Sequence, residues 1–163
     1  MRLDVEPTRY VFTVRIAEQR ASLFEFQSVK SRRVARLVQV GIRDFGSRER
    51  AFIEGSRGRV VTHFDQRMRD RQYAGGPRGT WKAICRDIVA ALPRKVHISF
   101  DIDGLSPDQG PGTGTPVPGG LSFPEMCHLL EALVASGRQV VGFDLCEVAP
   151  RAGDGEWNAN VGA

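Results

Sequence analysis

Short apolar runs rich in β-branched residues alternate with helical patterns over residues 37–145, and this alternation limits the possible folds most strongly. The apolar runs predict strands at residues 37–42, 59–64, 96–100 and 139–145. The helical patterns fall at residues 47–55, 80–92 and 122–136. Strands that alternate with helices are typical of parallel sheets with right-handed crossovers. We therefore expect an α/β fold with a mainly parallel sheet.

Capping residues support the predicted helix boundaries. Thr80 precedes the second helical pattern, and Ser122 with Glu125 three residues later has the spacing of a capping box. The shorter first pattern would begin at Ser47 and end at Gly55. Each predicted helix thus starts at a side chain that can accept hydrogen bonds from the free backbone amides.

Residues 1–35 form a segment in which no period dominates. It contains a short apolar piece, Tyr10–Val14, among scattered arginines. We make no structural assignment for this segment and treat residues 36–163 as the predicted domain.

The length and composition indicate a single globular domain. The chain has 163 residues, enough for one hydrophobic core. No apolar run approaches the roughly 20 residues of a membrane-spanning helix, so no membrane association is expected. The first residues lack the apolar core of a signal peptide, which makes the cytoplasm the expected location. Three widely spaced cysteines without a CxxC pair predict neither a disulfide framework nor a zinc site.

The net charge is +4, and much of the excess lies in two arginine-rich runs at residues 30–36 and 67–71. Such runs are able to bind nucleic acid. Neither run contains interleaved aromatic residues or a DNA-reading motif. We therefore interpret them as solvated helix faces and expect no nucleic-acid partner.

Asp101 and Asp103 follow the apolar run at 96–100, and a stretch rich in Gly and Pro follows at 111–121. Side chains at positions i and i+2 of a strand point to the same face, so the two carboxylates can reach a common centre. Open α/β sheets place their sites at the carboxyl ends of strands, and paired carboxylates suit a divalent cation. The alternative is that one aspartate caps a turn through Gly104 and the other is solvated.

The string SFDIDGLSP at residues 99–107 and the string PGTGTPVPGGL at 111–121 resemble the signature of the ureohydrolases, the family of arginase and agmatinase. Two further strings, GFDLCEVAP at 142–150 and VGIRD at 40–44, are similar to other motifs of that family. One departure is Ser106, where the family usually has aspartate. The resemblance implies a three-layer α-β-α fold with an incomplete sheet, in which residues 36–163 form the C-terminal portion of a larger domain.

The resemblance also implies roles for single residues. Asp101 and Asp103 match two carboxylates that bind a pair of manganese ions, and Glu147 matches the glutamate that pairs with the substrate's guanidinium group. Glu49 is a further candidate substrate contact, and Asp44 matches an aspartate near the site. No residue is assigned as catalytic. The implied reaction is metal-assisted hydrolysis of a small guanidino compound to urea and an amine.

The substrate within the family is indicated by one position. Gly46 occupies the place where arginases often carry a second aspartate, which favours agmatine over arginine. Outside the family context, Glu147 would be an ordinary carboxylate at a strand end.

The ligand set that the resemblance implies is incomplete in this chain. The family uses six metal ligands, and four of them lie in motifs like GGDH and DAHxD, which are absent here. The three histidines are His63, His97 and His128. We interpret His97 and His128 as structural, and the H-x-D pair of His63 and Asp65 as an ordinary strand end.

These gaps predict a fragment that is weakly active or inactive alone. The alternative is a non-catalytic remnant or interaction module of the same fold. Half of a sheet exposes an apolar edge, which predicts poor solubility or association, with a homo-oligomer as the expectation.

Overall fold

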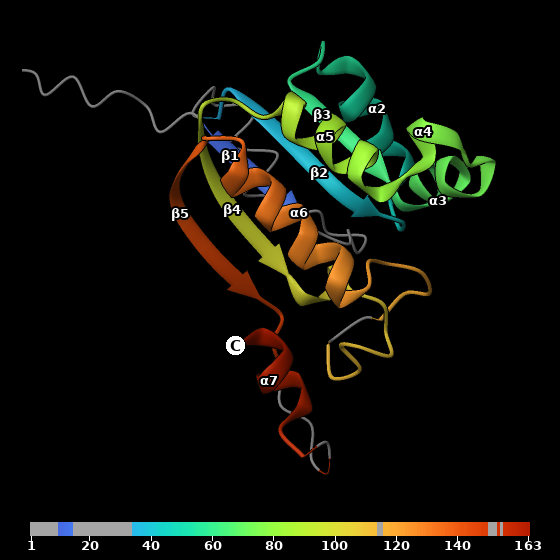
Figure 1. Ribbon diagram of the computed structural model, residues 1–163, viewed down its shortest axis with the longest axis vertical. Helices are drawn as coiled ribbons and strands as arrows, with labels where there is room; N and C mark the ends of the chain where they lie inside the picture. Colours follow the sequence, from blue (N-terminus) through green and yellow to red (C-terminus); the bar gives the residue numbers. More distant parts are fainter. Residues whose placement is uncertain (1–9, 15–33, 114–115, 150–152, 154) are drawn as a thin grey trace, which may run out of the picture.

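The computed structural model describes residues 10–14, 34–113, 116–149, 153 and 155–163. Within these residues, five strands form one sheet in the order β3-β2-β1-β4-β5, and every neighbouring pair is parallel (Figure 1). The strands are β1 (Tyr10–Val14), β2 (Arg36–Ile42), β3 (Val60–Phe64), β4 (Lys95–Asp101) and β5 (Gln139–Cys146). The predicted parallel α/β architecture is confirmed.

Helices cover both faces of the sheet. They are α2 (Ser47–Gly55), α3 (Asp65–Ala74), α4 (Gly76–Gly79), α5 (Trp81–Ala91), α6 (Phe123–Ala135) and α7 (Trp157–Gly162), with a 3-10 turn at Ile102–Gly104. Figure 1 shows α5 and α6 side by side across one face. Successive residues of β2 point to opposite faces: Val38 and Val40 lie in the main core with α5 and α6, whereas Leu37 packs with Phe52 of α2. This burial on both faces gives the expected three layers.

Two of the three predicted helix caps are present. The Thr80 hydroxyl accepts a hydrogen bond from the backbone amide of Ala83 at 3.2 Å. Ser122 and Glu125 form the reciprocal capping box of α6. The prediction for Ser47 is wrong, because Ser47 is already the first residue of α2 and, among the described residues, no side chain caps that helix.

The segment left unassigned by sequence analysis contributes the central strand of the sheet. β1 pairs with β2 on one side and with β4 on the other. Residues 1–9 and 15–33, which include residues 30–33 of the first arginine run, lie outside the described residues.

The interpretation of residues 67–71 as a solvated helix face is wrong for Arg69. The run lies on α3, but the Arg69 side chain is only 23% exposed and pairs with Glu125 of α6 at 2.8 Å. Arg71 pairs with Asp87 of α5 at 2.9 Å. Both arginines therefore join α3 to neighbouring helices.

One edge of the sheet is apolar and exposed. β5 is the last strand, and its Val140, Val141 and Phe143 are 41%, 41% and 55% exposed. The exposed edge is the feature that half of a sheet was expected to show.

No helix within the described part of the chain is long and apolar enough to cross a membrane.

Candidate functional site

The aspartate pair lies where β4 ends and the chain turns. Asp101 is the last residue of β4, and Asp103 lies in the 3-10 turn that follows. The backbone amide of Asp103 donates a hydrogen bond to Oδ1 of Asp101 at 3.0 Å. The expectation that both side chains share one strand face is therefore wrong, since the strand has already ended at Asp103.

Both carboxylates of this pair are nevertheless buried. Asp101 is 4% exposed and Asp103 is 6% exposed. The alternative interpretation is thus half correct: Asp101 caps the turn, but Asp103 is not solvated. Burial of two adjacent carboxylates is costly without a compensating charge or several hydrogen bonds.

Hard carboxylate oxygens fit one part of a site for a divalent cation such as Mn²⁺. Within the described residues, however, no group of three or more His, Cys, Asp or Glu side chains is placed to hold a metal ion. The described residues alone therefore do not fit a complete two-metal centre, and Asp101 and Asp103 could supply at most part of its donor set.

Glu147 follows the carboxyl end of β5, beside the carboxyl end of β4 where Asp101 lies. Asp101 is paired in register with Cys146, and Glu147 follows at once. Its side chain is exposed, and its backbone φ of 61° is in the left-handed region, which is uncommon for a residue other than glycine. Such backbone conformations cluster at functional sites.

Glu49 and Asp44 follow β2 rather than β4. Glu49 lies in the first turn of α2 and is 6% exposed, and Asp44 is half-buried in the connection before α2. Among the described residues, neither of them joins Asp101 and Asp103 in a group that could hold a metal. The structure brings Asp101 and Asp103 together, places Glu147 at the neighbouring strand end, and leaves Glu49 as a separate buried acid.

The H-x-D pair at the end of β3 consists of His63 and Asp65, whose neighbours are structural parts of the fold. The Asp65 carboxylate accepts a hydrogen bond from the backbone amide of Gly120 at 3.4 Å and lies 3.6 Å from Nε of Arg69. Burial, and then the nearby Arg71, lower the pKa of His63. Asp65 is therefore engaged with the loop before α6.

A polar cluster joins β4 to β5 just before the strand ends. The Ser99 hydroxyl donates a hydrogen bond to Oδ1 of Asp144 at 2.7 Å, and Nδ1 of His97 lies 3.6 Å from Oδ2. A side chain at Gly142 would meet the His97 ring at 2.5 Å. His97 thus packs between strands.

Two arginines that the sequence analysis did not assign to the site lie beside it. Arg43 donates a hydrogen bond to the carbonyl oxygen of Asp103 at 2.9 Å, and Arg69 donates to that of Gly120 at 2.6 Å. Arg43 is part of the VGIRD string at 40–44, so the sequence carried a signal for it. Arg69 had no comparable signal.

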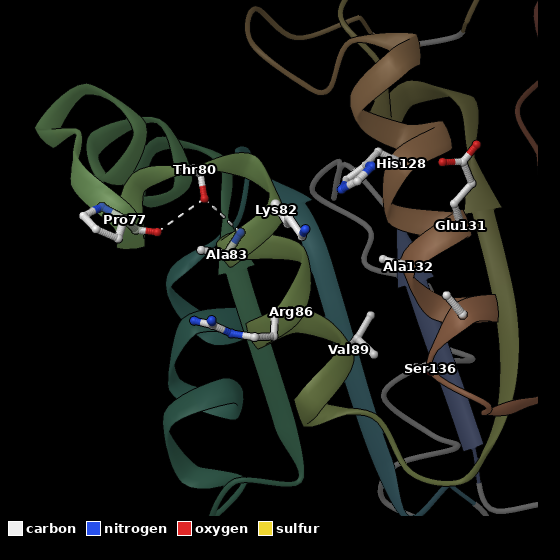
Figure 2. Close-up of a pocket in the computed structure, with 11 residues that line it drawn as sticks. Pro77, Thr80, Lys82, Ala83, Arg86, Val89, His128, Glu131, Ala132 and Ser136 are labelled. Carbon is white, nitrogen blue, oxygen red and sulfur yellow. Dashed lines mark hydrogen bonds between the residues drawn. The ribbon is translucent and has the colours of Figure 1, made fainter.

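A groove of about 740 Å³ lies elsewhere, between α5 and α6 (Figure 2). Lys82 and Arg86 of α5 line it from one side, and His128 and Glu131 of α6 from the other. None of the candidate site residues lines this groove. The groove is therefore separate from the acidic residues at the carboxyl ends of β4 and β5.

The fold is an open parallel α/β sheet, a class of protein that places its sites outside the carboxyl ends of the strands, and Asp101 and Glu147 lie at two such neighbouring ends. The sequence model of the arginase family matches residues 17–163 of this chain. The chain therefore belongs to the arginase family.

Individual relatives agree with this assignment. An arginase of Schizosaccharomyces pombe is 33% identical over 150 residues, which are 92% of this chain and 40% of the relative. An N(1)-aminopropylagmatine ureohydrolase of Thermus thermophilus is 37% identical over 127 residues, which are 78% of this chain and 38% of the relative. The arginase of Bacillus caldovelox has the same fold, with a TM-score of 0.74, 21% identity, and coverage of 94% of this chain and 57% of that one. The chain spans about 40% of the length of these two curated relatives.

Proposed function

We propose that this chain is part of a manganese-dependent ureohydrolase, which hydrolyses a small guanidino compound to urea and an amine. The observation that carries the proposal is the buried pair of Asp101 and Asp103 at the end of β4. Membership of the arginase family supports the reaction class.

In this proposal each acidic residue has a separate task. Asp101 and Asp103 hold part of the metal site, because their hard oxygens suit Mn²⁺. When bound, the metal supplies Lewis-acid activation of water. Glu147 accepts hydrogen bonds from the planar donor fork of the substrate's guanidinium group, and its exposed position leaves it accessible to a ligand. Glu49 is retained as a second candidate substrate contact.

The proposal includes an incomplete site. Two carboxylates do not satisfy a cation that takes about six oxygen or nitrogen ligands. We infer that further ligands come from protein outside the described residues, and that this chain alone is weakly active or inactive. Residues 36–163, together with β1 at Tyr10–Val14, would then form the C-terminal portion of the catalytic domain.

For the substrate we propose agmatine or a related amine. Gly46 lacks the carboxylate that the resemblance associates with recognition of the amino-acid end of arginine. The names of the two curated relatives divide between an arginase and an aminopropylagmatine ureohydrolase, so they support the reaction class more strongly than the substrate. The cytoplasmic location and the homo-oligomeric state remain predictions.

A second candidate is a non-catalytic module of the same fold. The observation in its favour is that the described residues contain no group of three potential ligands. Metal binding distinguishes the two candidates, since an interaction module needs none.

The test combines Mn²⁺ titration by calorimetry with urea release from agmatine, arginine and guanidinobutyrate. We expect weak Mn²⁺ binding that Asp103→Asn abolishes and that Asp108→Asn, at an exposed position in the same loop, leaves unchanged. Tight binding of two ions with turnover would contradict the incomplete site. No binding by the unmodified chain would contradict the metal role and favour the non-catalytic module.

A further inference from the structure

Arg43 follows a break in the regularity of β2. The register between β2 and β3 shifts between Val40 and Ile42, and the intervening Gly41 has a φ of 83°. An irregularity of this kind re-aims the residues that follow it. The next side chain after the strand, Arg43, is directed toward the turn that contains Asp103.

The Arg43 guanidinium contacts four backbone carbonyl groups of the described residues. Nη2 donates to Asp103 at 2.9 Å and to Leu105 at 3.1 Å, Nε donates to Val117 at 3.1 Å, and Nη1 donates to Gly41 at 3.3 Å. Arginine has five N–H donors in a rigid fork, so one side chain can join three segments in this way. The segments are the end of β2, the turn after β4 and the loop before α6.

Two residues of α3 hold the same loop as well. Arg69 donates to the carbonyl oxygen of Gly120, and Asp65 accepts from the amide of the same residue. The φ of Gly120 is 97°, and a Cβ there would lie 2.6 Å from the carbonyl oxygen of Leu105. The loop therefore lies directly against the turn, and Arg43 bridges the two.

We propose that Arg43 is a positioning residue that fixes the backbone of Asp103 and thereby the place where its carboxylate is presented. The proposal rests on the proposed function in one respect only: that function gives the reason why the placement of Asp103 matters, namely metal binding. Burial lowers the pKa of Arg43 and outweighs the opposite effect of Asp65 and Asp103, but arginine stays protonated in proteins. The positive charge beside the buried aspartates also offsets part of the cost of burying them.

The test is hydrogen–deuterium exchange of the metal-free Arg43→Lys protein. Lysine keeps the charge but lacks the planar fork, so at least two of the four hydrogen bonds are lost. One lost bond changes the opening equilibrium about fivefold, so two predict about 25-fold faster exchange of the Leu105 and Leu121 amides. Arg50→Lys is the matched control, since Arg50 is 62% exposed and pairs only with Glu54 in its own helix among the described residues.

Unchanged exchange at Leu105 and Leu121 in Arg43→Lys would overturn the proposal. Loss of protection throughout the protein, α6 included, would also overturn it, because Arg43 would then support the fold as a whole. Faster exchange confined to the turn and the loop supports it.

A spectroscopic measurement separates positioning from loop stability. Free Mn²⁺ gives an electron paramagnetic resonance signal that is lost on binding, and we expect Arg43→Lys to weaken binding at least about tenfold. Equal binding by the variant and the unmodified chain would overturn the proposal. If the unmodified chain binds no Mn²⁺, the proposed metal role fails, and the exchange measurement alone decides whether Arg43 fixes Asp103.

Discussion

Glu125→Gln should remove a pH-dependent contribution to folding stability that joins α6 to α3. The Glu125 carboxylate accepts hydrogen bonds from Nη1 and Nη2 of Arg69 at 2.8 and 3.2 Å, and from Gln72 at 3.2 Å. It also accepts from the backbone amide of Ser122 within the capping box, at 2.9 Å. Glutamine retains one side-chain oxygen at this helix position, so the substitution removes the charge and leaves much of the cap.

The magnitude follows from the pKa of this carboxyl group. Burial alone would raise the pKa of Glu125, but hydrogen bonds from Arg69, Ser122 and Gln72 outweigh it and lower the pKa from 4.5 to about 2. The difference between 4.5 and about 2 corresponds to about 3 kcal/mol between the two protonation states. Glutamine keeps neutral hydrogen bonds worth about 1 kcal/mol, so we expect a loss of about 2–3 kcal/mol at pH 7.

The sign of the pH dependence follows from the same values. A carboxyl group with a lowered pKa in the folded state stabilises that state fully above the unfolded pKa, and the contribution is lost as the pH falls toward the folded pKa. The window is therefore about pH 5 to about pH 2, and about 1 kcal/mol of the contribution remains at pH 3. The stability difference between the unmodified chain and Glu125→Gln should shrink by about 2 kcal/mol from pH 7 to pH 3.

Urea unfolding at a series of pH values measures this difference. Glu131→Gln, at an exposed position on the same helix, is the matched control and should change stability by less than about 0.5 kcal/mol. A stability difference for Glu125→Gln that stayed constant from pH 7 to pH 3 would refute the argument, because the ionised carboxylate would then contribute nothing.

Three further predictions follow from packing and exposure. Gly120→Ala should lower the free energy of unfolding by more than about 1 kcal/mol in thermal denaturation, because the φ of Gly120 is 97° and an added Cβ would clash with Leu105. Gly55→Ala is the control and should not lower it, because a Cβ there meets open space. Burial, and then Glu125, raise the pKa of Cys85 to about 12, so a thiol reagent at pH 8 should label the exposed Cys146 and leave Cys85 unmodified in the folded state. The chain should self-associate through the exposed edge of β5, and Val141→Lys should shift it toward monomer in sedimentation velocity. A monomeric unmodified chain would contradict this self-association.

Local signals predicted the secondary structure well where the physics is local. The capping box of Ser122 and Glu125 lies within one helical turn, so three residues of sequence suffice to recognise it. The apolar run before Asp101 is long and bounded by polar residues, and β4 extends the predicted strand by one residue at each end.

Features that depend on distant partners were not predictable in the same way. β1 is short, and its place between β2 and β4 depends on residues far along the chain. Arg69 was interpreted as solvated because its partner, Glu125, lies 56 residues away. The rule that residues i and i+2 share a face failed at Asp103 because it holds only while the strand continues, and the cap made by Asp101 turns the chain there.

The two halves of the motif that indicated the family form one structural unit. Leu105 and Leu121 make an isolated parallel bridge, in which the amide of Leu121 donates to Gly104 at 3.0 Å and the amide of Ser106 donates to Leu121 at 2.9 Å. The loop between them is thus closed at its base, immediately after the turn that contains Asp103. Glycine is required at position 120 because the backbone there presses on the carbonyl group of Leu105. Much of this motif therefore specifies the backbone support of one buried carboxylate, and a substitution in the loop should alter the placement of Asp103 without touching its side chain.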